Sequence, residues 1–292
     1  MSEAWTNVPD DPTTYPKISV TELRDLLRCT KKHDYAYRQG LRPAVSPSYF
    51  GKGRYLHGLE EARLTSYAQG TPLTTISEIG NAALADMRRQ RAEGDPSATV
   101  GEPDRLEING VYADYLKQVD MTGVEVLSVE REFFADVGLR SAGAPVLLHG
   151  FMDALISFDN QVWLIEHKTA GRAWSQGNFV FDYQSRLYTS AVEALGADRP
   201  VGTSFNFFYP KRWETKQVYV TPEESQLLLA EVQKAIDYRD SQMIVRQPHW
   251  GCNDCSFRTL CHAELSGGDS EYTRKTEFTV DQDKVDRFTE EA

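Results

Sequence analysis

The chain of 292 residues lacks any long apolar run, and it contains 4 cysteines. No stretch approaches the roughly 18 to 20 apolar residues of a membrane span, so we expect neither an integral membrane protein nor a membrane partner. The first residues, "MSEAWTNVPDDPTTYPK", lack the basic and apolar regions of a secretory signal, which favours a cytoplasmic protein. A Walker A loop is also missing, so we expect no ATP hydrolysis.

Positive charge is scarce in the chain as a whole, because the formal net charge is -11. This acidity argues against a protein whose entire surface binds nucleic acid. The segment from Arg24 to Arg54 is an exception, with eight basic and two acidic residues. It is either a solvated basic face or a binding surface for DNA phosphates. The residues that we assign to DNA binding are Arg24, Arg28, Lys31, Lys32, Lys52 and Arg54.

The residue pattern changes near residue 123, from one typical of helices to one typical of strands, rich in β-branched and aromatic residues. We expect helices near residues 20–29, 54–68, 76–91, 104–119, 179–195 and 222–243. We expect strands within residues 124–137, 146–158, 161–169, 203–210 and 216–220. The order of these elements predicts an α/β fold in which helices flank a mixed central sheet.

The same pattern suggests how the chain is organised. We expect a polar lead (residues 1–18), a helical region (19–122), an α/β core (123–245) and a cysteine-rich segment (246–265) that completes the same domain. The last part, 266–292, is acidic, and we expect a loosely held tail.

Two neighbouring strands, "GFMDALISF" and "QVWLIEHKTA", carry the most informative polar residues. If Asp159 and Asn160 form a two-residue hairpin loop, then Phe158 pairs with Gln161. That register places Asp153 opposite Glu166, with Cβ atoms about 4.5 to 5.5 Å apart. Two carboxylates at this distance repel each other, so they make a poor structural pair.

Apolar neighbours surround these carboxylates, and buried charges are unfavourable unless something compensates them. Mg²⁺ and Mn²⁺ prefer carboxylate oxygens, so a divalent cation would offset the repulsion. Lys168 lies about 6.6 Å beyond Glu166 on the same strand face. There it could orient a water molecule or stabilise charge on a phosphate oxygen. The alternative at this point is a solvent-facing strand end with three incidental polar side chains.

Gly150-x-x-Asp153 followed by Glu166-x-Lys168 resembles the core motif of the PD-(D/E)XK nuclease superfamily. The resemblance implies a restriction-endonuclease-like core. Two further motifs are similar to those of the RecB-like branch of that superfamily, namely Gly53-x-x-x-His57 and Gln184-x-x-x-Tyr188. As implied by the resemblance, the metal ligands are His57, Asp153, Glu166 and the main-chain carbonyl of His167. The catalytic residues are Asp153, Glu166, Lys168, Gln184 and Tyr188.

Other residues near these motifs allow more than one interpretation. Glu130 and Glu132 precede the hairpin. We expect one of them to face solvent, and the other either joins the acidic site or faces solvent as well. His149 is expected to be structural. Several aromatic residues between the basic ones could stack single-stranded bases or pack in a core. They are Tyr35, Tyr37, Tyr49, Phe50 and Tyr55.

The cysteines have the spacing C-x2-C-x5-C at Cys252, Cys255 and Cys261, with Cys29 far upstream. In an intracellular protein this clustering favours a metal site over disulfides. The spacing fits either zinc or an iron-sulfur cluster. The sequence also resembles RecB-like nucleases that hold a 4Fe-4S cluster, including CRISPR-associated exonucleases. That resemblance implies a structural 4Fe-4S cluster bound by all four cysteines.

The resemblance implies a DNA exonuclease that uses Mg²⁺ or Mn²⁺ and acts on single-stranded ends. The resemblance is compatible with partner proteins in recombination, CRISPR adaptation or phage replication. The sequence does not distinguish among these three. Two alternatives are a structure-selective or restriction-like endonuclease and a non-catalytic module for DNA binding or complex assembly. A binding module would not need Lys168.

Overall fold

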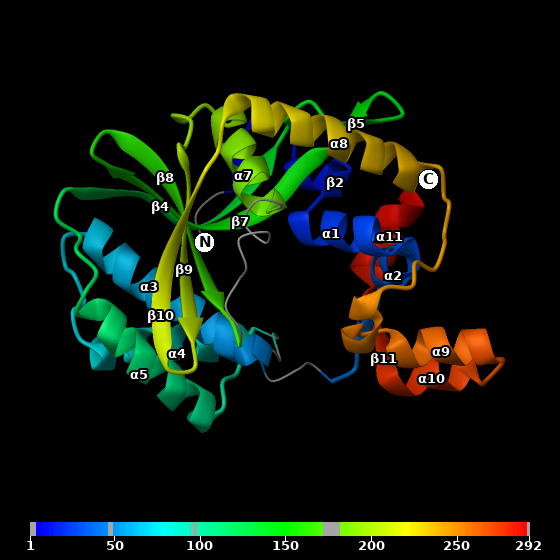
Figure 1. Ribbon diagram of the computed structural model, residues 1–292, viewed down its shortest axis with the longest axis horizontal. Helices are drawn as coiled ribbons and strands as arrows, with labels where there is room; N and C mark the ends of the chain where they lie inside the picture. The colour runs from blue at the N-terminus through cyan, green and yellow to red at the C-terminus, as the bar shows by residue number, and fades with distance from the viewer. Residues whose placement is uncertain (1–3, 46–48, 94, 96–97, 172–181, 291–292) are drawn as a thin grey trace. The chain divides into compact units, whose positions relative to one another are not determined.

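The computed structural model describes residues 4–45, 49–93, 95, 98–171 and 182–290 (Figure 1). The chain forms two compact units, and each is assembled from separate stretches of sequence. Unit 1 comprises Met1–Val8, Pro47–Val137 and His149–Leu228. Unit 2 comprises Pro9–Ser46, Gly138–Leu148 and Leu229–Ala292.

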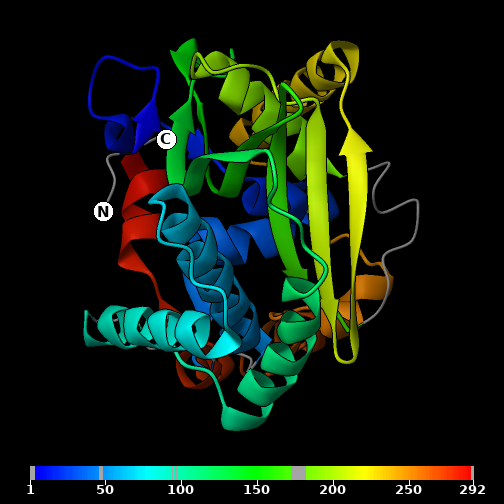
Figure 2. The same cartoon turned by 90° about the vertical axis from the view of Figure 1, so that its left-hand side faces the viewer.

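A mixed sheet organises unit 1, as the sequence predicts. Its strands follow the order β1-β4-β7-β8-β9-β10. β7 pairs antiparallel with β8, β8 pairs parallel with β9, and β9 pairs antiparallel with β10. In Figure 2, β9 and β10 lie side by side in yellow. Every residue of β9 is buried, so this strand lies inside the fold. The strands are β1 (Trp5–Thr6), β4 (Val124–Ala135), β7 (Leu147–Phe158), β8 (Gln161–Thr169), β9 (Gly202–Tyr209) and β10 (Arg212–Tyr219).

The β7–β8 hairpin has the predicted register. Phe158 pairs with Gln161, and Ala154 pairs with Ile165. Asp159 and Asn160 form the loop with φ angles of 50° and 57°. Two positive φ angles are typical of the tight turn that matches the twist of a hairpin. One further pair in this register brings Asp153 opposite Glu166.

Helices cover the sheet of unit 1, and their boundaries follow local signals. They are α3 (Tyr49–Ala68), α4 (Ile76–Ala92), α5 (Glu102–Leu116) and α7 (Tyr183–Ala194). The side chain of Thr75 caps α4 in a capping box with Glu78, and Asp182 caps α7. α3 begins five residues before the predicted start at 54. The predicted helix at 179–195 falls partly outside the described residues.

The core of unit 1 is built on alternate residues of β9. Phe208 packs with a cluster from α3, α4 and α5 that includes Tyr55 and Tyr112. Phe205, Phe207 and Tyr209 form a separate cluster. Because neighbouring strand residues point to opposite faces, these two clusters lie on the two faces of the sheet. The predicted flanking of the sheet by helices is confirmed.

Gly150 on β7 has no side chain, which allows two aromatic side chains to approach the strand closely. A Cβ atom at this position would lie 2.6 Å from the Tyr188 hydroxyl and 3.1 Å from the ring of Phe133. We therefore expect Gly150→Ala to destabilise the protein by about 1 to 3 kcal/mol through overpacking. Gly110 in α5 is the matched control, because a Cβ there meets nothing within 4 Å. Gly110→Ala should stabilise the protein by about 0.5 to 1 kcal/mol, because Gly110 is an exposed position inside helix α5. Equal effects of the two changes in urea unfolding would contradict this interpretation.

Unit 2 is largely helical. Its N-terminal part contains α1 (Val20–Arg28), capped by the side chain of Ser19, then α2 (Thr30–His33), the π-helical turn η2 (Asp34–Arg38) and β3 (Leu41–Pro43). β2 (Lys17–Ile18) pairs with the first residues of β7. The long helix α8 (Pro222–Asp240) starts in unit 1 and ends in unit 2. Unit 2 also contains η1 (Pro12–Thr14), β5 (Arg140–Ser141), β6 (Ala144–Pro145), η3 (Trp250–Asp254) and α9 (Arg258–Ser266).

The expectation of a loosely held tail after residue 266 is wrong. These residues form α10 (Ser270–Glu277), β11 (Phe278–Val280) and α11 (Gln282–Glu290). β11 pairs with β3, and Phe278 is buried in a stack on the ring of Phe257. The acidic composition reflects the exposed faces of these elements, whereas one aromatic residue and a strand pairing anchor them. None of the helices in the described part of the chain has the length and apolar composition needed to cross a bilayer.

Candidate active site

Three ionisable side chains from separate elements meet in unit 1. They are His57 on α3, Glu130 on β4 and Asp153 on β7, and their nearest ligand atoms lie within 4.8 Å of one another. His57 Nδ1 is 3.3 Å from both Glu130 Oε1 and Asp153 Oδ1. Burial lowers the pKa of His57, but the negative charges of Asp153 and Glu130 outweigh burial and raise the pKa well above its usual value. Two carboxylates and an imidazole in this arrangement could hold a divalent cation.

Asp153 has two oxygens in different environments. Oδ2 accepts a hydrogen bond of 2.7 Å from the main-chain N–H of His167, whereas Oδ1 faces His57. Burial alone would raise the pKa of Asp153, but the charge of His57 and the His167 ring, whose Nδ1 lies 3.4 Å from Oδ2, hold it well below its usual value. The carboxylate is therefore ionised and anchored through one oxygen, which leaves the other oxygen for a cation.

Glu130 adopts an unusual backbone conformation, with φ of 41° inside strand β4. A non-glycine residue in this region is strained by about 1 to 3 kcal/mol, and such strain clusters at functional sites. Glu132 is not part of the group, because its Oε1 lies 2.9 Å from His149 Nε2. The sequence left open which glutamate joins the acidic site, and the structure places Glu130 there.

Glu166 and Lys168 occupy the same strand face beside this group. The Lys168 ammonium donates hydrogen bonds to the Glu166 carboxylate and, over 3.1 Å, to Gln184 Oε1. Burial and the charge of Asp153 raise the pKa of Glu166 against the opposing effect of Lys168. A nearby cation would stabilise the ionised form of such a carboxylate. The structure thus brings Asp153, Glu166, Lys168 and Gln184 together as a set, while Glu166 contacts Lys168 rather than His57.

Tyr188 lies one helical turn after Gln184 and is buried beside β4. Its ring packs edge-on against Phe133, with centroids 5.0 Å apart. Gln184 is also buried, although its amide oxygen reaches Lys168. Of the two residues of the Q-x-x-x-Y motif, Gln184 touches the lysine and Tyr188 supports the aromatic packing over Gly150.

A buried charge network behind the site was not predicted from the sequence. It includes Glu60 and Arg63 on α3 and the side chain of His167, whose Nε2 lies 3.2 Å from Glu60 Oε2. Burial lowers the pKa of His167, but Glu60 and Asp153 together raise it to about 9. The sequence signal was present, because Glu60 follows His57 by three residues and so shares its helix face.

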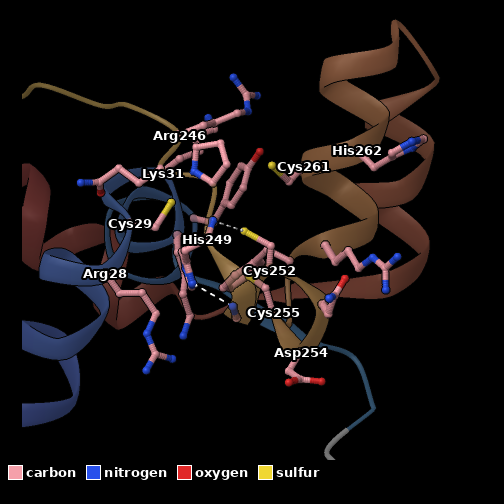
Figure 3. Close-up of a pocket in the computed structure, with 18 of the residues that line it drawn as sticks. Arg28, Cys29, Lys31, Arg246, His249, Cys252, Asp254, Cys255, Cys261 and His262 are labelled. Carbon is pink, nitrogen blue, oxygen red and sulfur yellow. Dashed lines mark hydrogen bonds between the residues drawn. The ribbon is translucent and has the colours of Figure 1, made fainter.

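The four cysteines of unit 2 line one cavity of about 500 Å³ (Figure 3). Burial raises the pKa of the Cys255 thiol, and the proximity of Cys29 and Cys252 adds to this effect. None of the four cysteines forms a disulfide. Within the described residues, no three cysteine sulfurs come within 4.8 Å of one another. Basic side chains that line the cavity outnumber acidic ones. The basic residues are Arg28, Lys31, Lys32, Arg246 and Arg258, and the acidic residue is Asp254.

Most of the basic residues predicted to bind DNA have carboxylate partners. Lys31 lies 3.2 Å from Asp34, and Lys32 lies 2.6 Å from Asp25, both in unit 2. In unit 1, Lys52 pairs with Glu107 and Arg54 pairs with Asp95. These partners neutralise much of the local positive charge. Arg24 and Arg28 are the other members of the predicted set, and they belong to α1.

The base-stacking interpretation is wrong for three of the aromatic residues. Tyr55 is buried in the core of unit 1, while Tyr35 and Tyr37 are buried in that of unit 2. Their rings pack against apolar neighbours, so they cannot stack on bases. Phe50 is 55% exposed. The side chain of Tyr49 lies outside the described residues.

Comparison with known protein families accounts for the motifs that meet at this site. The sequence model of the PD-(D/E)XK nuclease superfamily matches residues 17–262. The chain therefore belongs to the PD-(D/E)XK nuclease superfamily, as its motifs predict. This membership makes it a nuclease and implies a divalent cation as cofactor and DNA as substrate. No curated protein matches the chain in sequence.

Two solved structures show a distant likeness. The protein named SSO0001 is 13% identical with a TM-score of 0.42, and the match covers 89% of this chain and 90% of that one. A protein from Eubacterium rectale named "Putative exonuclease" is 11% identical with a TM-score of 0.42, over 80% of this chain and 90% of that one. Both scores lie below 0.5, so the fold assignment depends on the family match and the sheet topology.

Proposed function

We propose that the protein is a RecB-like DNA exonuclease that requires Mg²⁺ or Mn²⁺, acts on single-stranded ends and carries a structural 4Fe-4S cluster. The observation that carries the nuclease part is the position of Lys168. Its ammonium is held by Glu166 and Gln184, and Glu166 lies opposite Asp153 in the register of the β7–β8 hairpin. A lysine fixed by two partners beside a divalent-cation site is suited to a phosphodiester substrate.

The residues of unit 1 fit the cation that this function needs. Asp153 Oδ1, His57 and either Glu166 or Glu130 would hold it, together with the main-chain carbonyl of His167. When bound, the cation would polarise the phosphate and make water a better nucleophile. Lys168 would place its positive charge where negative charge develops on the phosphate oxygens. Gln184 would keep the ammonium in that position.

The RecB-like assignment draws support from two contacts. His57, from the Gly53-x-x-x-His57 motif on α3, reaches Asp153 across 3.3 Å. Gln184, from the second motif, reaches Lys168 across 3.1 Å. Each motif thus contributes a side chain that touches the proposed catalytic residues, which is what a nuclease of this branch requires.

The cavity lined by cysteines supports a cluster in preference to a single zinc ion. Four thiolates around zinc lie about 2.3 Å from the metal, which holds the sulfurs within about 4 Å of each other. The sulfurs here are spread more widely around a cavity of about 500 Å³. A 4Fe-4S cluster also takes four thiolates but is larger.

The mode of cutting is tested with end-labelled linear and circular single strands in Mg²⁺ or Mn²⁺. We expect the linear strand to be degraded to small products from an end, while the circle stays intact. EDTA should stop the reaction, because the cation is required. Cleavage of the circle at a comparable rate would identify an endonuclease instead. Cleavage of neither strand by cation-loaded protein would contradict the proposed activity and favour a DNA-binding module.

A further inference from the structure

A carboxylate from α3 is buried behind the proposed metal site. The side chain of Glu60 is 2% exposed, and it forms two hydrogen bonds with Arg63, at 2.6 Å and 3.2 Å. Its Oε2 also lies 3.2 Å from Nε2 of His167, whose side chain is completely buried. Glu60 therefore joins a cation on its own helix to an imidazole on strand β8.

Further polar groups complete this network. Arg63 donates to the Tyr115 hydroxyl over 3.3 Å, and Asn206 Nδ2 lies 3.3 Å from His167 Nε2. His167 and Asn206 are paired residues of β8 and β9, so they share a face of the sheet. Both partners meet the same ring nitrogen, Nε2, whereas Nδ1 of the ring lies 3.4 Å from Asp153 Oδ2. A buried ion pair is weak evidence for stability, since apolar residues of similar volume often serve as well.

His167 links the network to the proposed metal site. His167 donates its main-chain N–H to Asp153 Oδ2 over 2.7 Å, while its ring contacts Glu60. The position of its backbone sets the direction of the carbonyl proposed as a metal ligand. The ring nitrogen Nδ1 lies 3.4 Å from the same Asp153 oxygen, so displacement of the ring would disturb the anchored carboxylate.

We propose that Glu60 is a positioning residue: by fixing the His167 ring, it holds the Asp153 carboxylate so that Oδ1 points toward the catalytic cation. This inference rests on the proposed metal-dependent nuclease function. Glu60 touches neither the cation nor the substrate in this arrangement. Its role is that of an outer partner that holds the ligands in place, and such partners typically contribute about 10- to 100-fold to metal affinity or activity.

The test is the affinity of the whole protein for Mn²⁺, measured by isothermal titration calorimetry without DNA. Glu60→Gln keeps the shape of the side chain but removes its charge, and we expect Mn²⁺ to bind about 10- to 100-fold more weakly. The value of kcat should fall with it at limiting Mn²⁺, while KM for DNA stays the same. Unchanged Mn²⁺ affinity in the folded variant would overturn the proposal.

Unit 2 offers a matched control in Glu22. This side chain is also 2% exposed, and its Oε1 lies 3.1 Å from His33 Nε2 and 3.9 Å from an Arg239 nitrogen. Glu22→Gln therefore makes the same chemical change in a similar buried environment. It should lower thermal stability as Glu60→Gln does, but leave the Mn²⁺ affinity unchanged. Equal losses of affinity in both variants would mean that general loosening, rather than positioning, explains the effect.

A double mutant tests whether Glu60 acts through His167. If it does, Glu60→Gln should have little further effect on Mn²⁺ affinity in a His167→Gln background, because contacting residues are not additive. Additive losses would contradict the proposal. If Glu60→Gln fails to fold, Glu60→Asp retains the charge beside Arg63 but withdraws it from His167. That variant should also bind Mn²⁺ more weakly, and wild-type affinity would overturn the inference.

These measurements separate the inference from the proposed function. Wild-type protein that binds Mn²⁺ but cleaves no DNA would refute the nuclease proposal and still allow the role of Glu60 in metal binding to be tested. Wild-type cleavage combined with an unaffected Glu60→Gln variant would refute the role of Glu60 alone.

Discussion

Lys168→Ala is expected to reduce kcat for DNA cleavage by at least about 10²- to 10³-fold, the usual loss when one charge-stabilising donor is removed. The physical reason is that the ammonium is the group placed to meet negative charge on the phosphate. The Glu166 carboxylate, Asp153 and His57 remain in the variant, so Mn²⁺ should still bind. Single-turnover cleavage of a labelled strand measures the effect without interference from product release.

Lys117→Ala is the control for this change. Lys117 also belongs to unit 1 and forms an ion pair of 2.8 Å with Asp114, but its side chain is 72% exposed. Exposed pairs contribute little to stability, so the control should keep the wild-type rate and fold. If Lys168→Ala cleaves DNA as fast as Lys117→Ala does, the catalytic assignment of Lys168 is wrong, because removal of a catalytic lysine must slow cleavage.

Cys252→Ser should remove the cluster and loosen unit 2. We expect anaerobically purified wild-type protein to be brown and to contain about four iron atoms per chain. A cross-link that closes a loop longer than 100 residues stabilises a protein by about 4 to 5 kcal/mol in the chain-entropy model. Since about 1 kcal/mol shifts Tm by about 2 to 4 °C in proteins of this size, we expect Tm to fall by about 10 to 20 °C.

His262→Ala is the matched variant for the cysteine change. His262 lines the same cavity but is not one of the predicted ligands. Its replacement should leave the iron content and the brown colour intact. Colourless wild-type protein with one zinc ion per chain would instead show that the thiols bind zinc, even though their sulfurs are widely spaced around the cavity.

The sequence predicted the sheet and the hairpin register because those features follow from local rules. The Asp159-Asn160 pair is typical of a two-residue turn, and the turn fixes which residues face each other. That alone was enough to bring Asp153 opposite Glu166. The prediction of a loosely held tail after residue 266 was wrong for the converse reason. Its charge was visible, whereas the pairing of β11 with β3 depends on residues more than 200 positions apart.

The site was predicted in part. The motifs carried by the resemblance located His57, Asp153 and Lys168, and the structure brings His57 to Asp153 and Lys168 to Glu166. Glu130 was left undecided because strand periodicity puts it on the same face as Glu132, and the sequence gives no sign of its positive φ. Glu60 was missed because a glutamate on a helix usually faces solvent. Its burial depends on Arg63 and His167, which tertiary packing brings together.

The most direct test of the metal site is anomalous diffraction from crystals soaked in Mn²⁺. We predict an anomalous peak in unit 1 bounded by Asp153 Oδ1, His57 and the Glu166 or Glu130 carboxylate, close to the carbonyl of His167. Its position would also show which of the two glutamates binds the cation. Absence of a peak there at saturating Mn²⁺, or a peak that does not touch Asp153, would contradict the account.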